Sequence, residues 1–202
     1  MRRLIVLISL LAVASFIFVA PAGSVPSDTT AGGANHVVMA IATADSPVAL
    51  HSGLQVAPAG GPTVDSTNLA EAISQDCFGC KSVAVAFQAV FVIGDPNVVT
   101  PTNAAIALNL NCVSCSTYAF AHQYVLSTGG PVRLSDSGRA QINQIRQELA
   151  GLASSNLPFD QLTTELKQEK AKFDAVINDE LISVGQQPNG AEQTESNVAP
   201  AD

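Results

Sequence analysis

The strongest constraint on this chain is an internal repeat with a period of 35 residues. When the sequence is aligned with itself at that offset, eleven of the 29 positions from 68 to 96 are identical, and no gap is needed. The shared pattern is N-x-A-x-A-[IL]-x3-C-x2-C-x-[ST]-x-A-x-A-x-Q-x-V-x3-G-x-P. It indicates a duplicated core over 67–134, with copies at about 67–101 and 102–134. Two copies are too few for a solenoid, so we predict a pseudo-two-fold pair sharing one core.

The two halves of each copy give signals of different strength. The first half is predicted to be a short helix, because Thr102 or Asn103 can cap it and Ala104–Leu108 are good helix formers. The half after each C-x-x-C is ambiguous. Its β-branched residues and the spacing of two between identical Ala, Gln and Val residues favour a strand, whereas its length and alanine content favour a buried helix. We predict a helix and keep the strand as the alternative.

Two amphipathic helices are predicted over 135–184. In the first, Ile142, Ile145 and Leu149 form an apolar stripe, and Ser135 or Ser137 caps the N-terminus. The second extends from Pro158 to about residue 184 with a similar stripe, and it forms a hairpin that must cover another apolar surface. The predicted fold class is therefore mainly α, with two pseudo-symmetric C-x-x-C repeats packed on a C-terminal helical hairpin. The alternative is α+β, with the segments after C-x-x-C as strands.

The N-terminus has the pattern of an export signal. Met1–Arg3 is basic, Leu4–Val19 is almost entirely apolar, and Ala20-Pro21-Ala22 matches a small-residue cleavage site. We predict a signal peptide over 1–22, with an uncleaved membrane anchor as the alternative. The apolar run is short for a bilayer span, so we expect cleavage and no stable membrane span afterwards.

The segments on either side of the predicted core are polar or rich in breaking residues. Residues 23–66 are rich in Gly, Pro, Ser and Ala, and we predict mainly a flexible spacer, with the short apolar stretch 36–43 as a candidate for an added strand. Residues 185–202 are polar and acidic, and we predict a disordered tail.

Four cysteines in an exported chain favour disulfide bonds, because the compartment is oxidising. Two pairings respect the repeat: local, within each C-x-x-C, or crossed between the copies. The crossed pairing closes longer loops and is slightly preferred, but the spacing leaves both open. A zinc site with four thiolate ligands and a redox-active C-x-x-C are the two alternatives. The cysteines are Cys77, Cys80, Cys112 and Cys115.

Few other residues are candidates for binding or catalysis. Gln88 and Gln123 occupy equivalent places in apolar runs, which predicts buried amides bonded to the other copy or, alternatively, a ligand contact. The chain has no G-x-S-x-G motif and no P-loop, so we expect no enzyme, catalytic residue, resident metal or cofactor. The formal charge is -8, with nine Lys and Arg residues against seventeen Asp and Glu, which argues against nucleic-acid binding.

The double C-x-x-C block resembles a family of secreted actinobacterial proteins without an assigned activity. The similarity continues through Pro131–Ser135 and the long helix after it, and covers about residues 68–184. Some related sequences carry a label for peptide zinc metalloproteases. That label transfers no site here, because the chain lacks H-E-x-x-H and its histidines, His36, His51 and His122, are scattered. The resemblance implies location and fold more than activity.

These observations predict a secreted or cell-envelope structural and interaction module stabilised by disulfides. Its partner is expected to be another envelope or extracellular protein. The alternative is an extracytoplasmic thiol–disulfide redox protein that uses one C-x-x-C pair.

Overall fold

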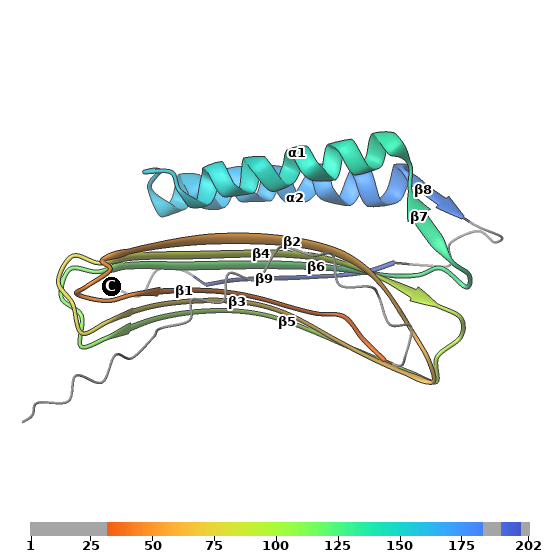
Figure 1. Ribbon diagram of the computed structural model, residues 1–202, viewed down its shortest axis with the longest axis horizontal. Coiled ribbons are helices and arrows are strands. Elements are labelled where there is room, and N and C mark those ends of the chain that lie inside the picture. The colour runs from red at the N-terminus through yellow and green to blue at the C-terminus, as the bar shows by residue number, and fades with distance from the viewer. Residues whose placement is uncertain (1–31, 184–190, 199–202) are drawn as a thin grey trace, which may run out of the picture.

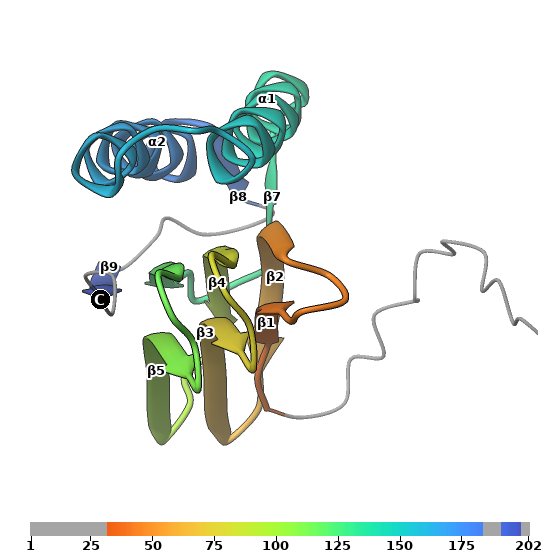
Figure 2. The same cartoon turned by 90° about the vertical axis from the view of Figure 1, so that its left-hand side faces the viewer.

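The computed structural model describes residues 32–183 and, for the backbone alone, residues 191–198. The predicted signal peptide lies outside the described residues. Three layers are stacked: a helical hairpin, a sheet beneath it, and a second sheet beneath that (Figures 1 and 2). Neither described helix is long and apolar enough to cross a membrane.

Six long strands form three successive turns of a parallel β-solenoid. In each turn the chain crosses once through each sheet, and equivalent strands of successive turns pair side by side. Sheet A contains β1, β3 and β5, and sheet B contains β2, β4 and β6 with a final antiparallel strand, β9, on β6. The strands are β1 (Asn35–Ala42), β2 (Val48–Gly60), β3 (Thr63–Gln75), β4 (Lys81–Ile93), β5 (Val98–Leu110), β6 (Ser116–Ser127) and β9 (Ala191–Val198).

The prediction of a mainly α, largely helical fold is wrong. The expected short helices are strands β3 and β5, and the alternative interpretation of the segments after C-x-x-C describes β4 and β6. Identical residues at spacing two, such as Asn68, Ala70 and Ala72, are the buried side of a strand whose other side is more exposed. Helix propensity of alanine is a small term per residue, and stacking of whole strands overrides it.

The predicted pseudo-two-fold pair is also wrong. Asn68 pairs with Asn103 and Gln88 with Gln123 in parallel strands, so the two copies are related by a translation along the stack. The 35-residue period is one solenoid turn. Equal turn lengths put every residue beside its own equivalent.

The first turn of the solenoid lies in residues for which the sequence predicts mainly a flexible spacer. Strands β1 and β2 lie within the range 23–66 and pair with β3 and β4. The register offset is 32 residues in β1, from His36 to Asn68, and 33 in β2, from Gln55 to Gln88. A gapless comparison at 35 residues cannot detect this turn, because its two bends are shorter.

The expected disordered tail also contains a strand. Residues 191–198 form β9, whose backbone pairs with β6 from Ala119 to Leu126. An edge strand such as β6 has unpaired backbone groups, and a covering strand satisfies them. Residues 184–190 and 199–202 lie outside the described part of the chain.

The interior between the sheets is filled by small side chains. The buried alanines of facing strands form one cluster, which lets the two sheets approach closely there. Polar ladders cross this interior along the stack. Gln88 donates to Gln55 at 2.8 Å and accepts from Gln123 at 2.7 Å, and Asn68 donates to Asn103 at 2.9 Å. The two asparagines are therefore rungs of the stack and not helix caps.

The hairpin covers the other face of sheet B. Helices α1 (Asp136–Ala153) and α2 (Phe159–Asp179) lie within the predicted range 135–184, but α2 ends about five residues before its predicted end, where the chain forms a strand. The ends of the hairpin are joined by the short pair β7 (Val132–Leu134) and β8 (Leu181–Ser183). Their apolar stripes pack on the large side chains of β4 and β6, including Phe87, Phe120 and Tyr124. Ser135 caps α1 through the backbone N–H of Gly138 at 2.8 Å.

Three polar contacts set the position of α2 along β6. Tyr118 bonds to Thr163 at 2.9 Å, His122 to Asp174 at 2.7 Å and Tyr124 to Asn178 at 2.5 Å. The contacts span about 20 Å of strand and about 22 Å of helix at the usual rises per residue. Because the two lengths match, a single straight helix makes all three contacts.

The glutamine ladder predicts a graded loss of stability. Gln88 is the middle rung and also donates to the Ala34 carbonyl at 2.8 Å. Gln88→Ala leaves buried partners unpaired and opens a cavity, so we expect unfolding free energy to fall by about 2–4 kcal/mol. Gln55→Ala, at the less buried end, should cost about 1 kcal/mol. Urea unfolding measures both, and equal losses would contradict the ladder.

Candidate functional site

The two C-x-x-C segments are the bends that connect sheet A to sheet B. One joins β3 to β4 in the second turn of the solenoid, and the other joins β5 to β6 in the third turn. Asp76 and Asn111 have φ values of 51° and 50°, and the equivalents Gly79 and Ser114 have 66° and 56°. Both bends therefore have the same left-handed geometry. The backbone ladder continues through them, with Asp76 N–H donating to the Leu110 carbonyl at 2.9 Å.

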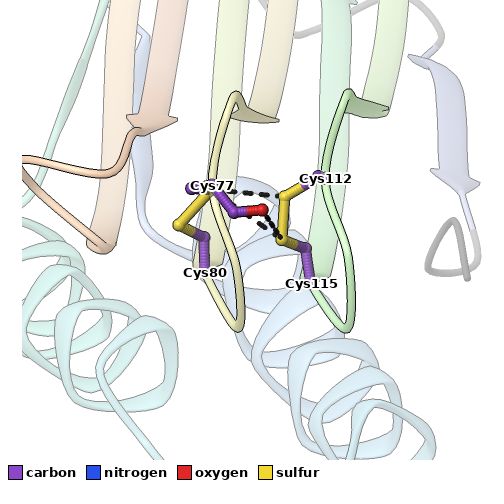
Figure 3. A group of neighbouring side chains, drawn as sticks. All are labelled: Cys77, Cys80, Cys112 and Cys115. Atoms are coloured by element: carbon purple, nitrogen blue, oxygen red, sulfur yellow. Dashed lines mark hydrogen bonds between the residues drawn. A yellow bond between two sulfur atoms is a disulfide. The ribbon is translucent and has the colours of Figure 1, made fainter.

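The four sulfur atoms gather at this end of the solenoid (Figure 3). Disulfide bonds join Cys77 to Cys80 and Cys112 to Cys115. Between the pairs, Cys77 Sγ lies 3.2 Å from Cys112 Sγ and 3.8 Å from Cys115 Sγ. All four sulfur atoms lie within 4.8 Å of one another.

The local pairing differs from the slightly preferred crossed one. The crossed pairing is preferred only because it closes longer loops, whereas the backbone already joins the two bends by stacking each beside its equivalent. Within each bend the Cα atoms are 6.2 and 5.9 Å apart, which is inside the range that a disulfide spans. Each bridge therefore closes its own bend, and backbone pairing joins the turns.

The sulfur cluster is partly shielded. Cys80 is buried and packs against the alanine cluster between the sheets, while Cys77, Cys112 and Cys115 are half-buried. The residues inside the motifs face outward, and the side chains of Phe78 and Val113 are 77% and 61% exposed. The cluster thus lies between the core and an exposed apolar tip.

The surroundings do not favour an activated thiol. Reactive cysteines usually have a nearby cation or a helix N-terminus that lowers the thiol pKa. Lys81 follows Cys80, but its ammonium donates to the Ser155 carbonyl at 2.7 Å, in the bend of the helical hairpin. Each C-x-x-C lies between two strands and not at the start of a helix. These features favour a structural role for the bridges over redox catalysis.

Gln88 and Gln123 lie in the interior between the two sheets. Both are fully buried in the ladder, and Gln123 also donates to Ser66. The interpretation of buried amides describes them, although they bond to each other as well as to backbone.

The histidines do not come together. His36 occupies the rung equivalent to Asn68, His51 bonds to the Met39 carbonyl, and His122 lies under α2. His122 is a packed ring, in edge contact with Phe87 and Phe173, and it also bonds to Asp174. Within residues 32–183, three or more possible metal-binding side chains gather only at the four cysteines.

Sequence reasoning missed one feature, the outward face of sheet A. Side chains alternate along its strands, and the outward set near the cysteine end is aliphatic. Paired rows place Val37 beside Leu69, Ile41 beside Ile73, and Ile73 beside Leu108. The alternation from Leu69 to Ile73 was the available signal. We call this surface the aliphatic face; it comprises Val37, Met39, Ile41, Leu69, Glu71, Ile73, Ala104, Ile106, Leu108 and Leu110.

No protein-family model matches the chain, and no curated protein or solved structure is significantly similar to it. The two features that bear on function are therefore the sulfur cluster and the aliphatic face.

Because each disulfide closes a short loop, we expect its loss to lower the unfolding free energy only modestly. A disulfide that closes a four-residue loop removes about 2 kcal/mol of unfolded-state entropy. We expect the double variants Cys77→Ala/Cys80→Ala and Cys112→Ala/Cys115→Ala each to lower unfolding free energy by about that amount and to remain folded. Urea unfolding tests this. Peptide mapping of the unreduced protein should give two intramotif pairs, and a crossed pair would contradict the structure.

The Asp174 contact predicts a pH dependence. Burial raises the pKa of Asp174, but hydrogen bonds from His122 and Lys170 outweigh burial and hold the pKa below its ordinary value. A carboxyl with a lowered pKa stabilises the fold above its unfolded pKa, and the contribution is lost as pH falls through the folded value.

Asp174→Asn should therefore have a lower unfolding free energy than the native chain at pH 7. This difference in unfolding free energy, called the gap below, should narrow below about pH 4, near the unfolded pKa of aspartate. Urea midpoints from about pH 3 to 7 bracket that pKa and measure the gap. Asp179→Asn, at an exposed position of the same helix, is the control and should show little change. A gap for Asp174→Asn that is independent of pH would refute the assignment.

Proposed function

We propose that the protein is a non-enzymatic structural module of the cell envelope or extracellular space that associates with a second copy of itself through the aliphatic face. The observation that carries the proposal is the contrast between the two outer faces of the solenoid. Sheet B is covered by the hairpin, whereas no described element covers the outer side of sheet A (Figure 2). Parallel sheets are usually covered on both faces.

The aliphatic face has the chemistry of a protein interface between sheets. Its large members remain partly exposed, with Val37 at 53%, Met39 at 44% and Leu108 at 40%. Its residues include no aromatic ring on which a sugar could stack and no basic group to attract phosphate or an anionic lipid. A second sheet with the same strand spacing and the same flat aliphatic surface is a complementary partner.

The size of the face predicts a reversible dimer. The aliphatic face spans residues 37–41 of β1, 69–73 of β3 and 104–110 of β5, and these 17 residues cover about 270 Å² at the usual rise and strand spacing. Two such faces would bury on the order of 500 Å², which is below the range of stable protein interfaces and typical of weak, transient ones. We therefore expect a concentration-dependent equilibrium.

Glu71 limits the strength of this association. It lies in the middle strand, between Met39 of β1 and Ile106 of β5, in the centre of the aliphatic face. When two faces pack about a two-fold axis near their centre, the two carboxylates come together in apolar surroundings. Like charges and lost hydration then oppose binding.

The dimer is tested with two matched substitutions on β5. Leu108→Lys places a charge within the aliphatic face, and Val98→Lys places one at a similarly exposed residue of the same strand, beside Thr63 and outside that face. We expect Leu108→Lys to weaken dimerisation at least about 100-fold, or roughly 2.7 kcal/mol, and Val98→Lys to leave it unchanged. Sedimentation equilibrium of the purified protein measures both, with circular dichroism to verify folding.

Glu71→Gln gives the opposite effect. Removing the charge while keeping the shape should strengthen the dimer about tenfold. A native protein that stays monomeric at hundreds of micromolar overturns the proposal, as does equal weakening by both lysine substitutions. Binding of a different protein by a monomeric chain would leave an interaction role but refute the second copy as partner.

A further inference from the structure

We infer that the four cysteines, when reduced, form a single tetrahedral binding site for one thiophilic divalent metal ion such as Zn²⁺. The inference is independent of the proposed dimer, because it concerns the bends at one end of the solenoid and not the aliphatic face. The disulfide-bonded and the metal-bound states use the same four sulfur atoms and exclude each other.

The distances fit such a site. Zinc bound by four thiolates has Zn–S bonds of about 2.3 Å, so neighbouring sulfur atoms of a tetrahedron lie about 3.8 Å apart. Sulfur atoms of different pairs already lie 3.2 and 3.8 Å apart, from Cys77 to Cys112 and to Cys115. The full set lies within 4.8 Å. Once the two S–S bonds are broken, side-chain rotation alone is needed to space the sulfur atoms evenly.

The backbone holds the cysteines in place without the disulfides. Gly79 N–H donates to the Val113 carbonyl at 2.9 Å, Val113 N–H to the Cys77 carbonyl at 3.2 Å, and Ser116 N–H to the Cys80 carbonyl at 2.8 Å. These bonds join the two bends and do not depend on the state of the sulfur atoms. A metal ion would therefore find ligands that are already gathered, which reduces the entropic cost of binding.

The ligand set is selective. Four sulfur ligands in tetrahedral geometry favour zinc and similar soft ions over magnesium or calcium, which prefer oxygen. Cys80 is buried beside the alanine cluster, and the other three sulfur atoms are half-buried, so water has limited access to the centre. Four thiolates in such a place would repel one another, and a bound dication offsets that charge.

The interconversion conserves atoms and electrons. Two equivalents of a dithiol reductant transfer four electrons and four protons to the two disulfides, giving four thiols and two oxidised dithiols. Binding of one Zn²⁺ then releases the four thiol protons to solvent. Two equivalents of a disulfide oxidant remove four electrons from the thiolates, reform the S–S bonds within each motif and free the metal.

The experiment is a cobalt titration of the purified full chain after reduction with a phosphine under nitrogen. Co²⁺ reports its geometry, so we expect intense visible bands of tetrahedral cobalt and a thiolate charge-transfer band that saturate at one equivalent per chain. One equivalent of Zn²⁺ should abolish the bands, and all four thiols should become unreactive toward a thiol reagent. The unreduced protein should give no such bands.

Two variants serve as controls. Cys112→Ser should lose the tetrahedral thiolate spectrum at one equivalent, whereas Ser114→Ala, in the same bend, should keep it. Circular dichroism follows folding, and if the reduced chain is unfolded, one equivalent of metal should refold it. The inference is overturned if the reduced protein binds no cobalt, if two ions bind independently at the two motifs, if the bands are those of octahedral cobalt, or if an unfolded reduced chain does not refold.

Discussion

The structure depends on the parallel pairing of each solenoid turn with an equivalent turn beside it. Because β3 and β5 pair at the same offset as β4 and β6, every inward residue lies next to its own counterpart. Amides are the side chains that benefit most from this arrangement. An asparagine or glutamine both donates and accepts, so identical amides in one column can bond to one another. Alanines in the same columns allow the two sheets to approach closely.

The outer sides of the two sheets differ in the size of their side chains and in whether another element packs on them. Sheet B has phenylalanines and tyrosines on its outer side, and the hairpin buries them with three polar contacts that fix its position. Sheet A has smaller aliphatic residues on its outer side near the cysteine end, with Glu71 at the centre of this aliphatic face. The first surface is part of the core, and the second is covered by no described element. The bends at one end add a third feature, a cluster of four sulfur atoms held by the backbone.

Sequence reasoning reached some of this and missed the rest for identifiable reasons. The hairpin stripes are visible because a helix of eighteen or more residues gives a long periodic signal. Residues such as Ala84, Ala86 and Gln88 match both a helix and a strand over a short range, and the larger helix propensity of alanine led to the wrong choice. The first turn was missed as a repeat because its bends are shorter. The aliphatic face was missed because β3 and β5 were predicted to be helices and most of the first turn a spacer.

The sequence by itself determined the 35-residue period and the equivalence of the two C-x-x-C motifs, since identical residues at a constant offset require equivalent environments. Only the tertiary structure decided that the copies are related by translation and pair residue by residue, that disulfides close each bend, and that no described element covers the outer face of sheet A. These outcomes depend on contacts between segments far apart in the chain. Local propensity and spacing contain no information about which of several possible partners a segment finally packs against.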